Sequence, residues 1–219
     1  MTYVVPKRFR QRLVDVPVVV LDNESTGVDM TTARSVECAL VRFENGVPVA
    51  HVSSLINPGI PIPAEATAIH GYVDDDVKDA PSISDFWHSV DKRFLEDTQL
   101  SAYNAGYDSH LIPRDAPIDH TWPMLDALVI VREVDRFARG QGRHKLEAAC
   151  QRHGIAIGEA HKALTDATAA GHLLFKLAPR IDYGDTLGGL LEWTRSAAAR
   201  QWYDFNDYVS RKQQQEQQP

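Results

Sequence analysis

The feature that most constrains this chain is an apolar, β-branched run over residues 16–21 that ends directly at two acids. Such a run is typical of a buried strand. Side chains two residues apart on a strand lie on the same face, so Asp22 and Glu24 would point together into one place. Two close carboxylates repel one another unless a cation or a proton lies between them, and hard oxygen ligands suit Mg²⁺ or Mn²⁺. A pair of acids at a strand end is nevertheless common, and more often it is simply solvated.

The residues that follow predict more strands and then helices. Strands are expected over 35–43 and 47–56, joined by Glu44-Asn45-Gly46, because Asn-Gly accepts the positive φ of a tight hairpin. Further on, apolar spacing and turn residues predict helices over 64–69, 82–95, 124–134, 145–153, 162–177 and from 185 onward, a strand over 100–103 and a brief helix after Asp108. Strands first and then strand–helix alternation favour an α/β layer fold with a mixed sheet, whose first three strands are antiparallel.

Composition narrows the class of protein. A length of 219 residues fits one ordinary domain plus an extension, and no apolar run approaches the ~18 residues that cross a bilayer. We see no secretory signal, and two distant cysteines, Cys38 and Cys150, favour a reducing cytoplasm. The net charge of −7 argues against a protein that coats nucleic acid with its whole surface. It is compatible with an enzyme that grips a few nucleotides at a carboxylate site, where divalent cations supply positive charge.

Two later segments add acids to the first pair. Asn104-Ala105-Gly106-Tyr107-Asp108 follows a short strand, so Asp108 is either the cap of the next helix or a third acid of the same site. His161 and Asp166 are five residues apart and do not share a face of one helix. We expect His161 on the loop before a helix and Asp166 in its first or second turn, near the buried side, where an acid needs a partner or a metal. The alternative is a surface histidine and a surface acid.

Together, DNESTG at 22–27, NAGYD at 104–108 and HKALTDA at 161–167 resemble, in order, the three exonuclease motifs of the DEDDh (DnaQ-like) family. That group includes the proofreading epsilon subunit of bacterial DNA polymerase III and RNA-trimming exonucleases. The resemblance covers about residues 16–177, and ATAIHGY at 66–72 and HKLE at 144–147 resemble its connecting segments. Asn23 stands where the family usually has an apolar or small residue, and Ser25 where it usually has Thr. We expect Asn23 to point away from the acids and to alter packing only.

The resemblance implies an RNase H-like three-layer α/β/α fold and a 3′→5′ exonuclease that releases 5′-mononucleotides from single-stranded DNA ends. It also implies two Mg²⁺ or Mn²⁺ ions roughly 3.5–4 Å apart, with His161 as the general base for the attacking water. Asp22 would bridge the two ions. The implied metal ligands are Asp22, Glu24, Asp108 and Asp166. The residues expected to meet the terminal nucleotide are Ser25, Thr26 and Gly27 at the sugar, Ile69 and His70 at the base, and Asn104 near the scissile phosphate.

Other functions stay open. An exoribonuclease shares these motifs, and contacts to a 2′-hydroxyl cannot be placed from sequence. A non-catalytic nucleic-acid-binding subunit is disfavoured because all five active-site residues are present, and a phosphatase for small molecules leaves the Ile69-His70-Gly71 loop unexplained. Five basic residues precede the last motif, and on a helix the four arginines among them would share a face. This face either follows a strand backbone or is an ordinary solvated face. The five residues are Arg132, Arg136, Arg139, Arg143 and Lys145.

We expect an exonuclease domain over residues 14–180 and a C-terminal helical extension over 181–219 that ends in a disordered Gln-rich tail. Trp193 and Trp202 indicate that part of this extension docks, either on the domain or on a partner such as a polymerase. The expected ligand is the 3′ end of single-stranded DNA or RNA, with no membrane partner.

Overall fold

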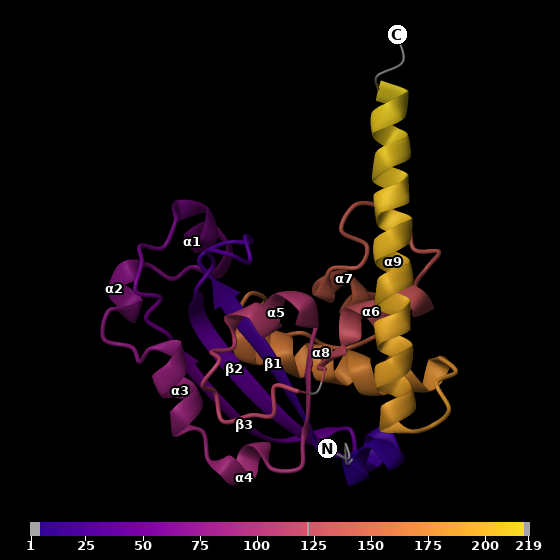
Figure 1. Ribbon diagram of the computed structural model, residues 1–219. Helices are drawn as coiled ribbons and strands as arrows, with labels where there is room; N and C mark the ends of the chain where they lie inside the picture. The colour runs from indigo at the N-terminus through magenta and orange to yellow at the C-terminus, as the bar shows by residue number, and fades with distance from the viewer. Residues whose placement is uncertain (1–4, 122, 217–219) are drawn as a thin grey trace.

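A computed structural model describes residues 5–121 and 123–216, which contain one five-stranded mixed sheet (Figure 1). The strand order is β3-β2-β1-β4-β5, in which β1, β2 and β3 are antiparallel neighbours and β4 and β5 run parallel to β1. The predicted mixed sheet with three antiparallel strands first is confirmed. The strands are β1 (Val18–Ser25), β2 (Ser35–Glu44), β3 (Val47–Leu55), β4 (Gln99–Ala102) and β5 (Leu125–Asp126).

Strand β1 is covered on both faces, which explains its continuous apolar sequence. Val18 and Val20 pack in one core cluster and Val19 in the other, and none of the three is exposed. The strand does not end before the acids as predicted but continues through them to Ser25. Because side chains alternate along it, Asp22 and Glu24 lie on the same face as Val18 and Val20.

The hairpin between β2 and β3 has the predicted chemistry. Asn45 and Gly46 have φ angles of 52° and 75°, both in the left-handed region that Asn-Gly adopts in a tight turn.

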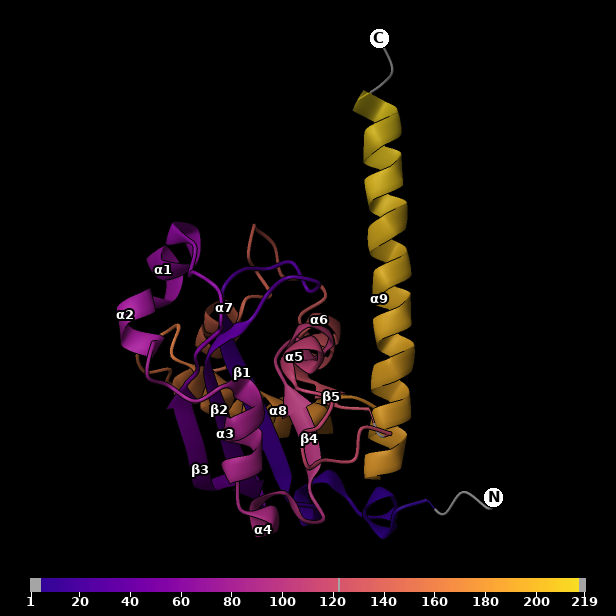
Figure 2. The same cartoon turned by 60° about the vertical axis from the view of Figure 1, so that its left-hand side comes forward.

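Helices cover both faces of the sheet and produce the predicted three layers (Figures 1 and 2). On the face of Val18 lie α6 (Ala127–Val134), α7 (Leu146–Arg152), α8 (Ala163–Leu177) and the first turns of α9 (Leu187–Glu216); on the opposite face lie α3 (Ile83–Ser89) and α5 (Ala105–Leu111). Helix α8 packs directly on β1 and β2. It approaches closely because Gly171 has no side chain: a Cβ there would lie 2.3 Å from the Phe43 ring.

Short helices occupy the connections between these elements. They are η1 (Lys7–Arg10), η2 (Leu13–Asp15), α1 (Ala64–His70), α2 (Asp74–Val77), α4 (Lys92–Leu95) and η3 (Ala178–Arg180). Helix α1 ends at Gly71 with a φ of 85°, the left-handed C-terminal residue that the sequence predicts.

The single helix predicted over 82–95 is two helices. Ser82 begins α3 by accepting a backbone N–H with its hydroxyl. Val90 is then extended and buried, and the Asp91 carboxylate starts α4 by accepting the N–H of Arg93 at 2.9 Å. The apolar spacing continues across this break, so periodicity alone does not reveal it.

Helix α9 stands beside the body of the molecule, and its C-terminal half extends beyond it (Figures 1 and 2). Its start belongs to the core, because Leu187 and Leu190 are fully buried. Farther along, Gln201 Nε2 donates to the carbonyl of Val129 in α6 at 2.9 Å.

The helix continues to Glu216, where the sequence predicts disorder. Gln and Glu are good helix formers, and each residue added to an existing helix adds a hydrogen bond. The last three residues of the predicted disordered tail lie outside the described part of the chain. Within that part, no helix combines the length and the apolar character needed to cross a membrane.

Candidate active site

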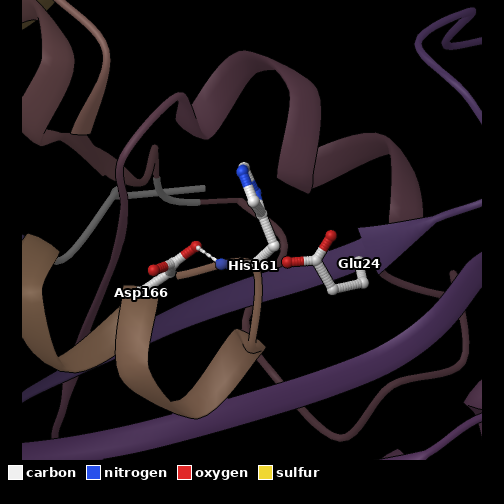
Figure 3. A group of neighbouring side chains, drawn as sticks. All are labelled: Glu24, His161 and Asp166. Atoms are coloured by element: carbon white, nitrogen blue, oxygen red, sulfur yellow. Dashed lines mark hydrogen bonds between the residues drawn. The ribbon is translucent and has the colours of Figure 1, made fainter. Parts of the chain in front are cut away.

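Three predicted site residues meet where β1 ends and α8 begins. The candidate ligand atoms of Glu24, His161 and Asp166 all lie within 4.8 Å of one another (Figure 3). Glu24 comes from β1, His161 from the loop before α8, and Asp166 from the first turn of α8. Residues 137 positions apart in the chain are therefore brought together by the packing of α8 on the sheet.

The loop before α8 is held in a specific conformation. His161 has a φ of 59°, and its backbone N–H donates to Asp166 Oδ2 at 3.2 Å (Figure 3). The other oxygen of this carboxylate, Oδ1, is buried and has no hydrogen-bond partner among the described residues. A buried carboxylate oxygen without a donor is costly unless a cation satisfies it.

The two remaining acids border this group. Asp22 lies near enough to Asp108, Asp166 and Glu24 for their charges to raise its pKa well above normal, after burial, which is the largest cause. Asp108 is 5% exposed and lies inside α5, whose cap position is Asn104. The alternative that Asp108 caps this helix is therefore wrong.

Burial and mutual repulsion make these acids hard to ionise without a counter-charge. Burial, followed by the charges of Asp166 and Glu37, raises the pKa of Glu24 to about 7. Burial is also the largest cause that raises the pKa of Asp108 to about 7 and that of Asp166 to about 6. Oxygen ligands with raised pKa values and an unpartnered Asp166 Oδ1 fit a site for divalent cations, which prefer several carboxylates.

Asn23 departs from the expectation that it points away from the acids. It lies on the opposite face of β1 from Asp22 and Glu24, but its Nδ2 donates to Asp108 Oδ1 at 3.2 Å. Its Oδ1 accepts the hydroxyl of Ser35 at 3.1 Å. The amide therefore contacts one of the site acids, because α5, which carries Asp108, packs on the face of β1 to which Asn23 belongs.

Sequence reasoning missed Glu37 on β2. It lies directly opposite Glu24 in the antiparallel register, on the same face of the sheet. Its Oε2 accepts the N–H of Ala163 at 3.0 Å and so caps the start of α8. A lone acid inside the apolar run of residues 36–41 is the signal that could have drawn attention to it.

Two further charged residues hold the loop before α8 in place: Lys162, which belongs to the loop, and Glu147. Lys162 Nζ donates to the carbonyl of His70 at 3.2 Å and lies 4.0 Å from the ring centre of Tyr72. It thereby connects the end of α1 to the loop that carries His161. Glu147, in the first turn of α7, has its Oε1 3.4 Å from His161 Nε2.

The residues predicted to meet the nucleotide differ in how open they are. The Ser25 hydroxyl donates to the Gly27 carbonyl at 2.9 Å, and the Thr26 hydroxyl accepts the N–H of Arg34 at 3.0 Å. The Tyr107 hydroxyl contacts the Ser25 hydroxyl and also donates to the Gly27 carbonyl. The hydrogen bonds of these polar groups therefore stabilise the turn after β1.

The other predicted nucleotide contacts are mixed. Ile69 is 57% exposed and Asn104 is also exposed, so both are free to meet a ligand. His70 is buried, and its Nδ1 accepts the N–H of Tyr72 at 3.0 Å. His70 therefore supports the loop from below rather than lining an open surface.

Comparison with known proteins identifies relatives of this arrangement. The RNase_T family of exonucleases matches residues 19–174. A DNA polymerase III subunit epsilon-like protein of Rhodobacter capsulatus is 36% identical over 171 residues, covering 74% of this chain but 24% of the relative. A PolC-type DNA polymerase III of Bacillus cereus is 29% identical over 170 residues, covering 75% of this chain and 12% of the relative. The chain thus spans a quarter or less of these relatives.

Solved structures share the fold at lower sequence identity. Exonuclease X in complex with 5′ overhanging duplex DNA is 21% identical with a TM-score of 0.64, covering 80% of this chain and 99% of that one. E. coli Exonuclease I in complex with a dA16 oligonucleotide is 16% identical with a TM-score of 0.64, covering 81% of this chain and 42% of that one. The expected RNase H-like three-layer fold is confirmed.

Proposed function

The chain belongs to the RNase_T exonuclease family, and from that membership we propose that it is a metal-dependent 3′→5′ exonuclease that releases 5′-mononucleotides from single-stranded DNA ends. The observation that carries the proposal is the meeting of Glu24, His161 and Asp166 within 4.8 Å, beside Asp22 and with a buried carboxylate oxygen left unpartnered.

The proposed metal ligands are Asp22, Glu24, Asp108 and Asp166. These carboxylates would hold two divalent cations, which when bound would supply positive charge next to the attacking water and the leaving 3′-oxygen. Mg²⁺ and Mn²⁺ both suit the oxygen ligands, and the donor set does not choose between them.

His161 is the proposed general base for the attacking water. Its ring is exposed on a loop that Asp166 holds by a backbone hydrogen bond, so it can reach solvent and substrate. The carboxylate of Glu147, 3.4 Å from Nε2, orients the ring and stabilises the imidazolium that forms after proton transfer.

The proposed nucleotide contacts remain those of the motif loops. Ile69 and Asn104 offer exposed side chains for these contacts, whereas the turn of Ser25, Thr26 and Gly27 contributes mainly its shape. Adding a Cβ at Gly27 would meet nothing within 4 Å, which leaves room for a sugar to approach the backbone there.

The proposed partners and compartment extend this function. Two relatives are named as DNA polymerase III proteins, which makes a polymerase a candidate partner for the extension over 181–219. Both described cysteines are free and buried, in keeping with the cytoplasm as the proposed compartment.

Digestion of end-labelled strands tests the function. Single-stranded DNA and RNA of one sequence, labelled at either end, are incubated with Mg²⁺, Mn²⁺ or EDTA. We expect stepwise loss from the 3′ end, none in EDTA or with Asp22→Asn, and a rate about 10²–10⁴-fold lower with His161→Ala. The matched control is His110→Ala, because His110 is exposed on α5 and bonds only within its own helix.

The outcomes separate the alternatives. Faster loss of RNA than of DNA would select the exoribonuclease. No metal-dependent loss from any strand would exclude the exonuclease and favour a non-catalytic nucleic-acid-binding subunit.

A further inference from the structure

An exposed basic segment over residues 132–145 comprises the last turn of α6 and the connection to α7, and we call it the basic arm. All five of its cations are exposed. They are Arg132, Arg136, Arg139, Arg143 and Lys145. On one continuous helix the four arginines would share a face, but α6 ends at Val134, so all except Arg132 lie on irregular chain. Gly140 and Gly142 adopt left-handed φ angles of 96° and 69°, which give this chain its turns.

Most of these cations have no carboxylate partner. Among residues 5–121 and 123–216, only one of the arm's five cations forms an ion pair. It is Arg136, which lies 3.9 Å from Glu133. The arm's other acid, Asp135, is taken by Arg152 of α7 at 2.7 Å. The arm therefore presents net positive charge, although the whole chain carries −7.

An aromatic side chain stands among these charges. Phe137 is 81% exposed, more than any other aromatic residue in the described part of the chain. The guanidinium of Arg136 lies 4.9 Å from its ring centre. Unpaired cations that track a phosphate backbone, next to a ring on which a base can stack, are the combination that binds single-stranded nucleic acid without sequence preference.

The arm leads directly to the active site. Its last residue, Lys145, is the N-cap of α7, and Glu147 in the first turn of that helix contacts His161. Figures 1 and 2 place the loop between α6 and α7 on the same side of the molecule as the carboxyl end of β1. A strand whose 3′ end lies at the acids can continue over this arm.

We propose that the basic arm binds the single strand upstream of the cleaved end, with Phe137 stacking on a base and Arg139 and Arg143 at phosphates. This inference rests on the proposed exonuclease function and adds a second contact region to it. A duplex would not fit equally well, because its bases are stacked on one another and offer no free face to the Phe137 ring.

Two substrates of different length separate the arm from the active site. The p-nitrophenyl ester of thymidine 5′-monophosphate reaches only the acids, whereas a 12-nucleotide oligothymidylate also reaches the arm. We expect Phe137→Ala to raise KM for the 12-mer about five-fold or more, with little change in kcat for it or in kcat/KM for the ester. Phe137→Trp retains a stacking ring and should keep the wild-type KM.

Salt dependence tests the arginines. In the double variant Arg139→Ala, Arg143→Ala, the slope of log KM for the 12-mer against log salt should decrease by about 0.7 for each phosphate that the variant no longer neutralises. Arg180→Ala is the matched control: Arg180 is exposed and follows the C-terminal end of α8, whereas Asp166 is in the first turn of that helix.

Each outcome is decisive. If the wild type hydrolyses neither substrate, the proposed function fails. If the 12-mer is cut and Phe137→Ala leaves its KM unchanged, the arm does not hold the strand and the inference is overturned, with the exonuclease intact. Because Phe137 is exposed, an unchanged melting temperature is expected and confirms that the variant is folded.

Discussion

At the scale of single residues, the site concentrates negative charge that the protein alone does not neutralise. Glu24 and Asp108 each have a pKa raised to about 7, mainly by burial, and Asp166 has one raised to about 6. The positive charge of Lys162 lowers the pKa of Glu24 but does not offset burial, and its Nζ also donates a hydrogen bond to the His70 carbonyl. The metal-free protein therefore holds protons at these acids more tightly when folded than when unfolded.

This sign predicts how stability depends on pH. A folded pKa above the unfolded value gives stability that is complete below the unfolded pKa and is lost as pH rises through the folded pKa. In EDTA, stability should fall between about pH 4 and pH 7, by about 1.4 kcal/mol for each unit by which a pKa is raised. Thermal melting should show a decrease of several degrees.

Metal should reverse this loss. Mn²⁺ binds the deprotonated acids, so it should raise the melting temperature more at pH 8 than at pH 5.5. The double variant Glu24→Gln, Asp166→Asn should lose less stability between pH 5 and pH 8, because only Asp22 and Asp108 still titrate with raised pKa values, and Mn²⁺ should stabilise it less. A metal-free melting temperature that increases from pH 5 to pH 8 would contradict the raised pKa values.

Asn23 provides a second prediction at this scale. Its hydrogen bond to Asp108 favours the ionised carboxylate and fixes its orientation, so we expect Asn23→Leu to increase the Mg²⁺ concentration for half-maximal activity about ten-fold. Ser35→Ala removes only the donor to Asn23 and should have a smaller effect in the same titration. If Asn23→Leu leaves the Mg²⁺ requirement unchanged, the Asn23 side chain contributes to packing only and does not orient Asp108.

The relative positions of site residues could be predicted from sequence where the residues are close together in the chain. Strand alternation places Asp22 and Glu24 on one face. The five-residue spacing of His161 and Asp166 predicts that His161 lies on the loop before the helix. Contacts across elements could not be predicted in this way. Glu37 faces Glu24 only because of the β1–β2 register, and Asn23 meets Asp108 only because of where α5 lies.

At the scale of elements, the start of α8 is the critical junction, because it positions His161 and Asp166. Glu37 caps this helix from β2. We expect Glu37→Ala to lower the free energy of unfolding by about 1 kcal/mol and to reduce activity, whereas Glu37→Gln keeps an acceptor for the Ala163 N–H and retains more of both. Chemical denaturation and strand digestion measure the two effects.

The matched control is a cap elsewhere. The Ser82 hydroxyl accepts the N–H of Asp85 at 3.2 Å at the start of α3, on the other face of the sheet. Ser82→Ala should cost a similar free energy and leave activity intact. Equal losses of activity in Glu37→Ala and Ser82→Ala would show that the effect is general destabilisation.

Elements with strong local signals were predicted well, and tertiary packing accounts for the rest. The Asn45-Gly46 hairpin and the stop at Gly71 follow from residues that adopt positive φ. The division of 82–95 into α3 and α4 depends on the burial of Val90 in the core, which a helical apolar pattern does not distinguish from a continuous helix.

At the scale of the whole molecule, α9 belongs to two environments. Its first turns complete the core, whereas its far half carries the exposed aromatic residues Trp202, Tyr203, Phe205 and Tyr208. The division into a domain over 14–180 and an extension over 181–219 stays a prediction. The packing of Leu187 and Leu190 indicates that the domain needs residues beyond 180.

Two truncations test where the independent part of the molecule ends. A chain that stops at residue 202 keeps the core leucines of α9 and the hydrogen bond from Gln201 to Val129. It should melt within a few degrees of the full chain and digest free strands at the same rate, because the removed half of the helix extends beyond the body. A chain that stops at residue 186 exposes the core surface that Leu187 and Leu190 cover and should lose several kcal/mol, at about 2–5 kcal/mol for each large core side chain removed. If the longer truncated chain also loses its fold or its activity on free strands, the far half of α9 is part of the enzyme and not a separate docking element.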